Sequence, residues 1–219
     1  MAWRLACGDP TIATMVLGYH LILTGYGHWL PNDPRGSLSK EIRNERIAPL
    51  GEIHHGRKRV QPPRSDLAAF QRQARGVLQH EVLWFDDAKR QAVAEAFAEV
   101  VEDRRYTCWA CAILSNHAHV AIRKHRDKAE TMIEVFQQAS AARLCRLADV
   151  PSGHPIWSLD PYKKFLDSAE AIERTIRYVR DNPVRSGLSP QQFAFVKSYR
   201  GEWSGGAGSR RRPAARNGR

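Results

Sequence analysis

Two histidines, His117 and His119, stand one residue apart in the apolar segment LSNHAHVAIRK, residues 114–124. Side chains alternate across a β-strand, so both imidazoles should point to one face while Ala118 points to the other. Two imidazoles roughly 6–7 Å apart on one face can bind a single divalent cation. The pair alone is a weak signal, because nine histidines in 219 residues readily give this spacing by chance. A metal site also needs a third ligand.

Tyr178 and Asn182 are the residues that can complete such a site. They stand four residues apart in a segment with helical periodicity, so they lie on nearly the same helix face, one turn apart. Tyr178 falls outside the apolar stripe of Ile172, Ile176 and Val179, which is the part of this helix expected in the core. The two residues offer a hydroxyl nucleophile and a neutral oxygen ligand. The alternative for Tyr178 is an amphipathic tyrosine at the rim of the core.

Periodicity and turn residues predict the elements that would carry these side chains. We expect strands at residues 15–27, 106–114 and 117–124, with an edge strand at 162–166. We expect helices at residues 67–80, from near Asp86 onward, at 128–148, and from a cap at Asp167 to a stop at Asn182–Pro183. These elements predict an α+β domain in which helices pack on one face of a small antiparallel sheet.

The chain is long enough for one domain, which we expect over residues 15–203. Residues 1–14 are expected to be a leader, residues 38–66 a polar and basic insertion, and residues 204–219 a disordered basic tail. No apolar run approaches the roughly 18–20 residues of a membrane span, and nothing near the start indicates export. We therefore expect a cytoplasmic protein without a membrane partner. The C-x-x-C of Cys108 and Cys111 lacks a second ligand pair, which favours strand packing over metal or redox chemistry.

The charge balance indicates a polyanionic partner. Lys and Arg number 34 against 23 Asp and Glu, a formal net charge of +11, and domains this basic most often bind nucleic acid. A merely solubilising surface is the alternative. The candidate DNA-contacting residues are Arg57, Lys58, Arg59, Arg64, Arg123 and Lys124, with Arg210–Arg212 in the tail. Trp29 or Trp157 can stack on a base, although either can equally be a core residue.

Taken in order, these motifs resemble a known family. An H-x-H strand, a tyrosine 59 residues after the second histidine, and the segment YVRDNPVRSGL are similar to the HUH single-tyrosine transposases, and to the REP-associated tyrosine transposases in particular. The segments YHLILTGYG and WLPNDPRGS and the position of Trp157 agree with this resemblance. It covers roughly residues 15–203.

The resemblance implies a ferredoxin-like α+β core of the HUH endonuclease type. It implies that His117, His119 and Asn182 bind a divalent metal, Mg²⁺ or Mn²⁺, and that Tyr178 is the nucleophile. The implied activity is cleavage and transfer of single-stranded or hairpin DNA, such as REP elements, through a 5′-phosphotyrosine, by a monomer or homodimer. Two features depart from the family pattern: Ala118 is smaller than the usual hydrophobic residue, and the insertion at 38–66 is longer.

Two other functions remain open from the sequence. In the first, the protein is a domesticated module that binds hairpin DNA without cutting it, which the intact set of histidines, tyrosine and asparagine argues against. In the second, the protein is a metal-dependent hydrolase in which Tyr178 is incidental. A nicking assay distinguishes the first alternative, and a covalent protein–DNA adduct excludes the second.

Overall fold

The structure is a computed structural model that describes residues 15–37, 39–56, 58–159 and 161–201. The leader expected at residues 1–14 and the tail expected at 204–219 lie outside these ranges. Within the described ranges, none of the helices combines the length and apolar character that a membrane span requires. Strands and helices are interspersed along the chain in an α+β fold, as the sequence predicts.

One antiparallel sheet has the strand order β2-β3-β1-β4. The strands are β1 (Gly18–Thr24), β2 (Cys108–Ile113), β3 (His117–Arg123) and β4 (Tyr162–Leu166). Helix α2 (Asp87–Asp103) connects β1 to β2, and helix α3 (Ala129–Leu144) connects β3 to β4. This β-α-β-β-α-β path is ferredoxin-like. The fold class and the expected edge strand are therefore confirmed.

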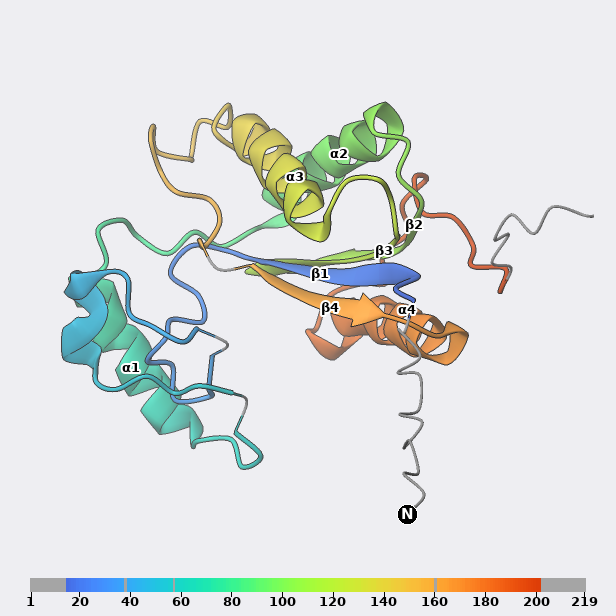
Figure 1. Ribbon diagram of the computed structural model, residues 1–219. Helices are drawn as coiled ribbons and strands as arrows, with labels where there is room; N and C mark the ends of the chain where they lie inside the picture. The colour runs from blue at the N-terminus through green and yellow to red at the C-terminus, as the bar shows by residue number, and fades with distance from the viewer. Residues whose placement is uncertain (1–14, 38, 57, 160, 202–219) are drawn as a thin grey trace, which may run out of the picture.

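Helices cover both faces of the sheet (Figure 1), so the expectation that they pack on one face is wrong. Helices α2 and α3 pack on the face that carries Leu21, Val120 and Ile122. Helix α4 (Ala169–Arg185) packs on the opposite face through residues such as Ile172. An amphipathic stripe shows that a helix buries one side, but it does not specify which sheet face receives that side.

The composition of β2 reflects its position between two helical layers. All of its residues are buried, which is typical of a short strand that is covered on both faces. Ala110 and Ala112 of β2 and Ala121 of β3 belong to the cluster under α4, where small side chains let the helix lie close to the sheet. Cys108 and Cys111 are buried free thiols, so the C-x-x-C segment packs within the strand as expected.

Helix α4 begins one residue later than expected. The N-cap is Ser168, whose Oγ accepts a hydrogen bond from the Ala171 N–H at 3.2 Å, rather than Asp167. A capping-box pattern matches Asp167 with Glu170, but Ser168 has the extended backbone of a cap residue and its side chain reaches the free N–H groups.

The same helix continues past the expected stop at Asn182–Pro183 and ends at Arg185. Pro183 removes one backbone donor, but it lies so near the end that little helix remains to be disrupted. The last turn is closed by the Ser186 N–H, which donates to the Asn182 carbonyl at 3.0 Å. Asn182 is therefore held in regular helix, one turn after Tyr178.

Helix α1 (Arg64–Val77) lies beyond one end of the sheet, apart from the other helices (Figure 1). A short 3₁₀ helix (Glu45–Leu50) packs against it. Helix α1 begins three positions before the expected residue 67, directly after Pro63, which is its N-cap.

The basic segment before α1 runs alongside the loop that follows β1. Ser37 of that loop bridges to His55, and the Lys58 N–H donates to the Arg35 carbonyl at 3.2 Å. These contacts place part of the expected insertion next to residues 25–37. That loop carries Trp29, which contacts His117.

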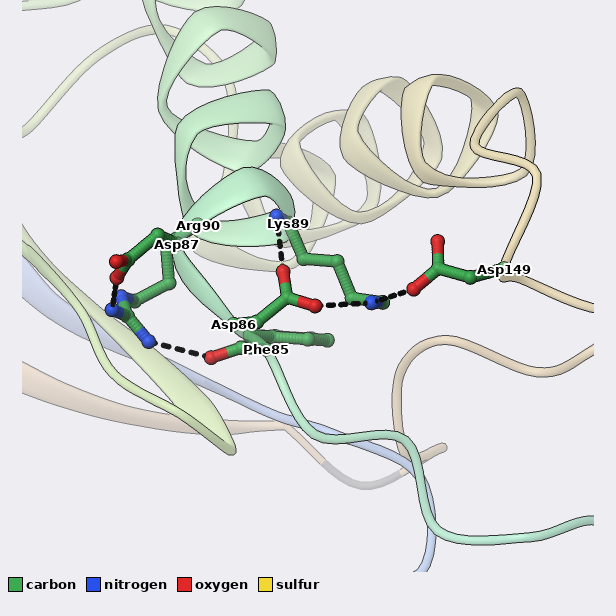
Figure 2. A network of polar contacts seen from close by, with 6 residues as sticks. All are labelled: Phe85, Asp86, Asp87, Lys89, Arg90 and Asp149. Atoms are coloured by element: carbon green, nitrogen blue, oxygen red, sulfur yellow. Dashed lines mark hydrogen bonds and ion pairs between the residues drawn. The ribbon is translucent and has the colours of Figure 1, made fainter.

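Ionic contacts hold the start of α2 (Figure 2). The Asp86 carboxylate accepts from the Lys89 N–H at 2.9 Å and from the Lys89 ammonium at 2.7 Å. The same ammonium, which is buried, also donates to Asp149, beyond the end of α3. The two carboxylates compensate the buried charge and join the two helices that share one sheet face.

Replacing Asp86 by Ala should lower the free energy of unfolding by about 1–2 kcal/mol, because the N-cap and one partner of a buried ammonium are lost together. Asp87→Ala is the matched control, since the Asp87 side chain is 97% exposed and its ion pair with Arg90 should contribute less than about 0.5 kcal/mol. Urea unfolding followed by circular dichroism measures both variants. Equal losses in the two variants would contradict the assigned role of Asp86.

Candidate active site

Three histidines gather on the sheet face beneath α4. His117 and His119 share this face of β3, and Ala118 between them is buried in the cluster on the other side. The register of β1 pairs Ile22 with His119, so His20, two positions earlier, lies on the same face beside it. His20 was not among the predicted site residues. The sequence feature that could have identified it is a polar side chain in an otherwise apolar strand.

The three imidazoles form a row. His20 Nε2 lies 3.1 Å from His119 Nδ1, and the Nε2 atoms of His119 and His117 lie 3.0 Å apart. At the end of the row, His117 Nδ1 lies 2.6 Å from the Asn116 side-chain oxygen. An amide oxygen only accepts, so His117 Nδ1 carries the proton and its Nε2 presents a lone pair. That lone pair accepts from the His119 Nε2–H, so His119 Nδ1 in turn accepts from the His20 Nε2–H.

The two facing Nε2 atoms have the spacing of a pair of metal ligands, and a bound cation would take the place of the proton between them. Ligand nitrogens about 2.1 Å from one ion and at right angles to each other are about 3.0 Å apart, which is the observed separation of the two Nε2 atoms. Asn116 and His20 engage the other ring nitrogens, as the outer partners of metal-binding histidines do. Among the described residues, no group of three or more His, Cys, Asp or Glu has metal-site geometry. A third ligand would have to come from another residue type.

Burial keeps these imidazoles neutral. Desolvation, followed by the charge of Lys164, lowers the pKa of His20 to about 4. Desolvation, with the nearby His28 and Arg35, lowers the pKa of His117 to about 4. Desolvation and the two neighbouring imidazoles lower the pKa of His119 to about 2. Histidine must be neutral to bind a metal, so these residues are in the required state at neutral pH.

The lowered pKa values predict acid sensitivity. Between about pH 6.5 and pH 4 the unfolded chain binds protons at these imidazoles that the folded protein does not, so stability should fall as pH falls. One histidine with a pKa lowered to about 4 accounts for a loss on the order of 3 kcal/mol over that range. The replacement His20→Gln should flatten this dependence, whereas His55→Gln, at an exposed position, should not. Urea midpoints in EDTA at several pH values test this; parallel curves for both variants would refute it.

Tyr178 lies over the histidine row from α4. Its ring centroid is 5.5 Å from that of His119 and 5.9 Å from that of His20, edge-to-face in both cases. Burial of Ile176 and Val179 against the sheet turns Tyr178 to the edge of the helix interface, where it is 42% exposed. The hydroxyl-bearing residue is thus both beside the imidazoles and open to a ligand.

Asn182 lies one turn beyond Tyr178 and is half-buried. Its side-chain nitrogen is buried and has no hydrogen-bond partner among the described residues. Buried polar groups are rarely left without a partner, and the two atoms of an amide are assigned only from their surroundings. Only the amide oxygen could bind a cation, so the role of Asn182 as the third ligand stays a prediction.

The loop after β1 brings Trp29 to the site. Its indole lies edge-to-face with the His117 ring at a centroid distance of 5.6 Å and remains 38% exposed. The backbone of Trp29 has a φ of 51°, which is uncommon for a residue with a side chain. Trp157, the other tryptophan considered for stacking, is a core residue that donates to Ser140 Oγ at 3.0 Å and contacts Phe85. It is not available to DNA.

The predicted basic contacts fall in different places. Lys58, Arg59 and Arg64 are exposed in and beside the segment that runs along the Trp29 loop. Arg57 and Arg210–Arg212 lie outside the described residues. Arg123 and Lys124 are exposed at the far end of β3, about 20 Å along the strand from His117, so the structure does not bring them to the histidines.

Comparison with known proteins gives matches only among solved structures. No family model and no curated protein matches the chain. A REP-associated tyrosine transposase bound to a REP hairpin matches 83% of this chain and 76% of its own, with 11% identity and a TM-score of 0.43. A Deinococcus radiodurans R1 protein assigned as a transposase matches 80% of this chain and 96% of its own, with 10% identity and a TM-score of 0.37. Over about four-fifths of its length, the chain is thus similar to two proteins named as transposases.

Proposed function

We propose that the protein is a transposase, a metal-dependent single-strand DNA endonuclease and strand transferase that works through a covalent 5′-phosphotyrosine. The observation that supports this most is the position of Tyr178, whose exposed ring lies 5.5 Å from the His119 ring, beside two converging imidazole nitrogens. The resemblance of the sequence motifs to REP-associated tyrosine transposases supports the same residues in the same roles.

His117, His119 and Asn182 would hold the divalent ion, Mg²⁺ or Mn²⁺. When bound, such an ion supplies positive charge to a non-bridging oxygen of a phosphodiester and offsets the charge that develops in the transition state. The protein contributes two neutral imidazoles whose Nε2 atoms face each other, and Asn116 holds the tautomer of His117. Binding of the ion would shift the His119 proton from Nε2 to Nδ1, toward His20.

Tyr178 would attack the scissile phosphorus through its phenolic oxygen. The new bond joins that oxygen to phosphorus, and the bond between phosphorus and the 3′-oxygen of the preceding nucleotide breaks. The phenolic proton is released and the departing 3′-oxygen takes up a proton, which leaves a free 3′-OH and a 5′-phosphotyrosine. The phosphodiester energy is retained in the covalent link, so a different 3′-OH can reverse the reaction and no nucleotide cofactor is needed.

The proposed substrate is single-stranded or hairpin DNA. The exposed edge of Tyr178 is a shallow site on a helix, which a phosphate of a flexible single strand can approach more readily than one held in a duplex. The net charge of +11 and the exposed Lys58, Arg59 and Arg64 favour a polyanion along the adjacent surface. Hairpins would present an unpaired strand beside a stem.

A covalent adduct tests the proposal directly. Labelled single-stranded hairpins from the DNA that flanks the protein's own gene would be incubated with the protein and Mn²⁺, then analysed on a denaturing gel. We expect a labelled protein–DNA species that protease digestion removes, together with a product bearing a free 3′-OH. Cleavage without an adduct would favour a hydrolase, and binding without cleavage would favour a hairpin-binding module.

Binding should weaken steeply with salt if the basic segment before α1 contacts the DNA backbone. For about five phosphate contacts to single-stranded DNA, log K against log[salt] should have a slope of roughly −3 to −4. Replacing Lys58, Arg59 and Arg64 by Ala should reduce the steepness by about 0.7 per lost contact, while cleavage of saturating DNA stays nearly intact.

The matched control removes three exposed arginines that flank α2 and α3, namely Arg104, Arg126 and Arg146. These residues lie outside the segment that runs beside the Trp29 loop, so their loss should leave the slope nearly unchanged. Fluorescence anisotropy over a salt series measures both variants. An unchanged slope in the first variant would place the phosphate contacts elsewhere.

A further inference from the structure

A shallow, open pocket with a cavity volume of about 30 Å³ lies next to Trp29, between the loop after β1 and helix α1. We call it the indole pocket, because Trp29 and Trp84 both line it. Trp84 comes from the segment that joins α1 to α2 and is 47% exposed. The other lining residues that matter here are Arg35, Phe70, Gln71 and Arg75.

The wall next to the histidines is held in a defined conformation. The guanidinium of Arg35 lies 4.3 Å over the Trp29 ring. That guanidinium is in turn fixed by two hydrogen bonds to the buried Asp33 carboxylate, at 2.9 and 2.6 Å. Together with the left-handed backbone of Trp29, these contacts keep one indole edge against His117 and its exposed part in the pocket. A strained backbone that its surroundings hold in place is characteristic of functional sites.

The opposite wall is also fixed. His28 Nε2–H donates to the Leu83 carbonyl at 3.2 Å, and the His28 ring packs edge-on against Trp84 with a centroid distance of 4.6 Å. Gly27, with a φ of 76°, lets the loop approach Val82 so closely that a Cβ would lie 2.8 Å from a Val82 methyl carbon. Close packing of two distant segments therefore fixes the positions of both walls.

We propose that one unpaired nucleobase of the DNA strand stacks on the exposed indoles at the mouth of the indole pocket, from a nucleotide close to the phosphate that meets Tyr178. This inference rests on the proposed function and adds a base-binding subsite to it. Aromatic rings that remain exposed and are held in place by their surroundings are the surfaces on which unpaired bases stack. Trp29 contacts His117 directly, so a base at the mouth of the pocket and a phosphate at the histidine row can belong to neighbouring parts of one strand.

Charge favours a nucleotide over an uncharged aromatic ligand. Arg35 is paired with Asp33, but Arg75 is exposed at the pocket and Lys58 is tied to the Arg35 backbone nearby. Cations beside stacking surfaces suit a ligand that carries a phosphate on each side of a flat base. Gln71, an exposed amide at the pocket, offers both a donor and an acceptor to a base edge.

The test compares an oligothymidylate of about twelve nucleotides with an abasic oligonucleotide of equal length, which has the same phosphates but no bases. Binding is measured in EDTA with Tyr178→Phe protein, so no chemistry intervenes. Relative to this parent, the added change Trp84→Ala should reduce the preference for the base-bearing strand by about tenfold. Trp84→Phe should retain most of the preference, and Phe165→Ala, which removes an exposed ring from β4, should retain all of it.

If Trp84→Ala unfolds the protein, Trp29→Ala is the second variant and should lose the same preference. An unchanged preference in the folded variant, or no preference in the parent, overturns the inference. The outcome is independent of the nuclease assay. A Trp84-dependent preference without any covalent adduct would support base binding at the indole pocket and refute the nuclease. An adduct with an unchanged preference would support the nuclease and refute base binding at the pocket.

Discussion

Tyr178→Phe should abolish formation of the covalent protein–DNA adduct and reduce strand cleavage by roughly 10³-fold or more, as removal of a nucleophile does in other enzymes. The change removes only the phenolic oxygen. The ring that remains can keep its edge-to-face contacts with His119 and His20, so fold and metal binding should be preserved. Affinity for hairpin DNA, measured by anisotropy in EDTA, should stay within about twofold of wild type.

Tyr162→Phe is the matched control for this prediction. Tyr162 is 39% exposed on the edge strand β4, and its partner Ile22 lies between it and His119 on the same sheet face. It is thus a second exposed phenol on the histidine side of the sheet, but it comes from another element. Its replacement should leave the adduct intact. An adduct that survives Tyr178→Phe and disappears in Tyr162→Phe would reassign the nucleophile.

The local relations at the site could be predicted from the sequence because they depend on short-range periodicity. Alternation along a strand places His117 and His119 on one face, and helical spacing places Asn182 one turn after Tyr178. Neither relation requires knowledge of the tertiary fold. The structure brings the tyrosine ring to the imidazoles, and that contact depends on which sheet face α4 covers.

The remaining features depend on pairings between distant segments, and these could not be predicted. His20 joins the histidine row only because β1 pairs with β3 in one register, with Ile22 opposite His119. The indole pocket depends on a similar meeting, between the Trp29 loop and the segment that carries Trp84. The second helical layer is another example, since the stripe on α4 does not encode its sheet face. In each case the contact depends on which distant segments of the chain pack together.

His119→Ala should eliminate cleavage that depends on a divalent ion, because one of two converging imidazole nitrogens is lost and the remaining ligands bind the ion poorly. His117→Ala should have the same effect. Mn²⁺ binding, followed by electron paramagnetic resonance or calorimetry, should fall in parallel, which separates loss of the metal from loss of DNA binding. Excess EDTA should reproduce the defect in the wild-type protein.

His20→Ala should have an intermediate effect on metal affinity and cleavage. A partial loss at His20 beside complete losses at His117 and His119 would be a more specific result than a loss at any single position. The His20 side chain lies 3.1 Å from His119 Nδ1, so its loss would free the tautomer of His119 without removing a proposed metal ligand. Losses of outer partners of this kind typically cost about 10–100-fold in metal affinity or activity. His125→Ala, beyond the far end of β3, should change neither quantity. The effects of the His117, His119 and His20 replacements are all expected to act through one bound ion. Undiminished cleavage by the wild-type protein in excess EDTA would therefore show that the histidine row does not serve a metal-dependent reaction.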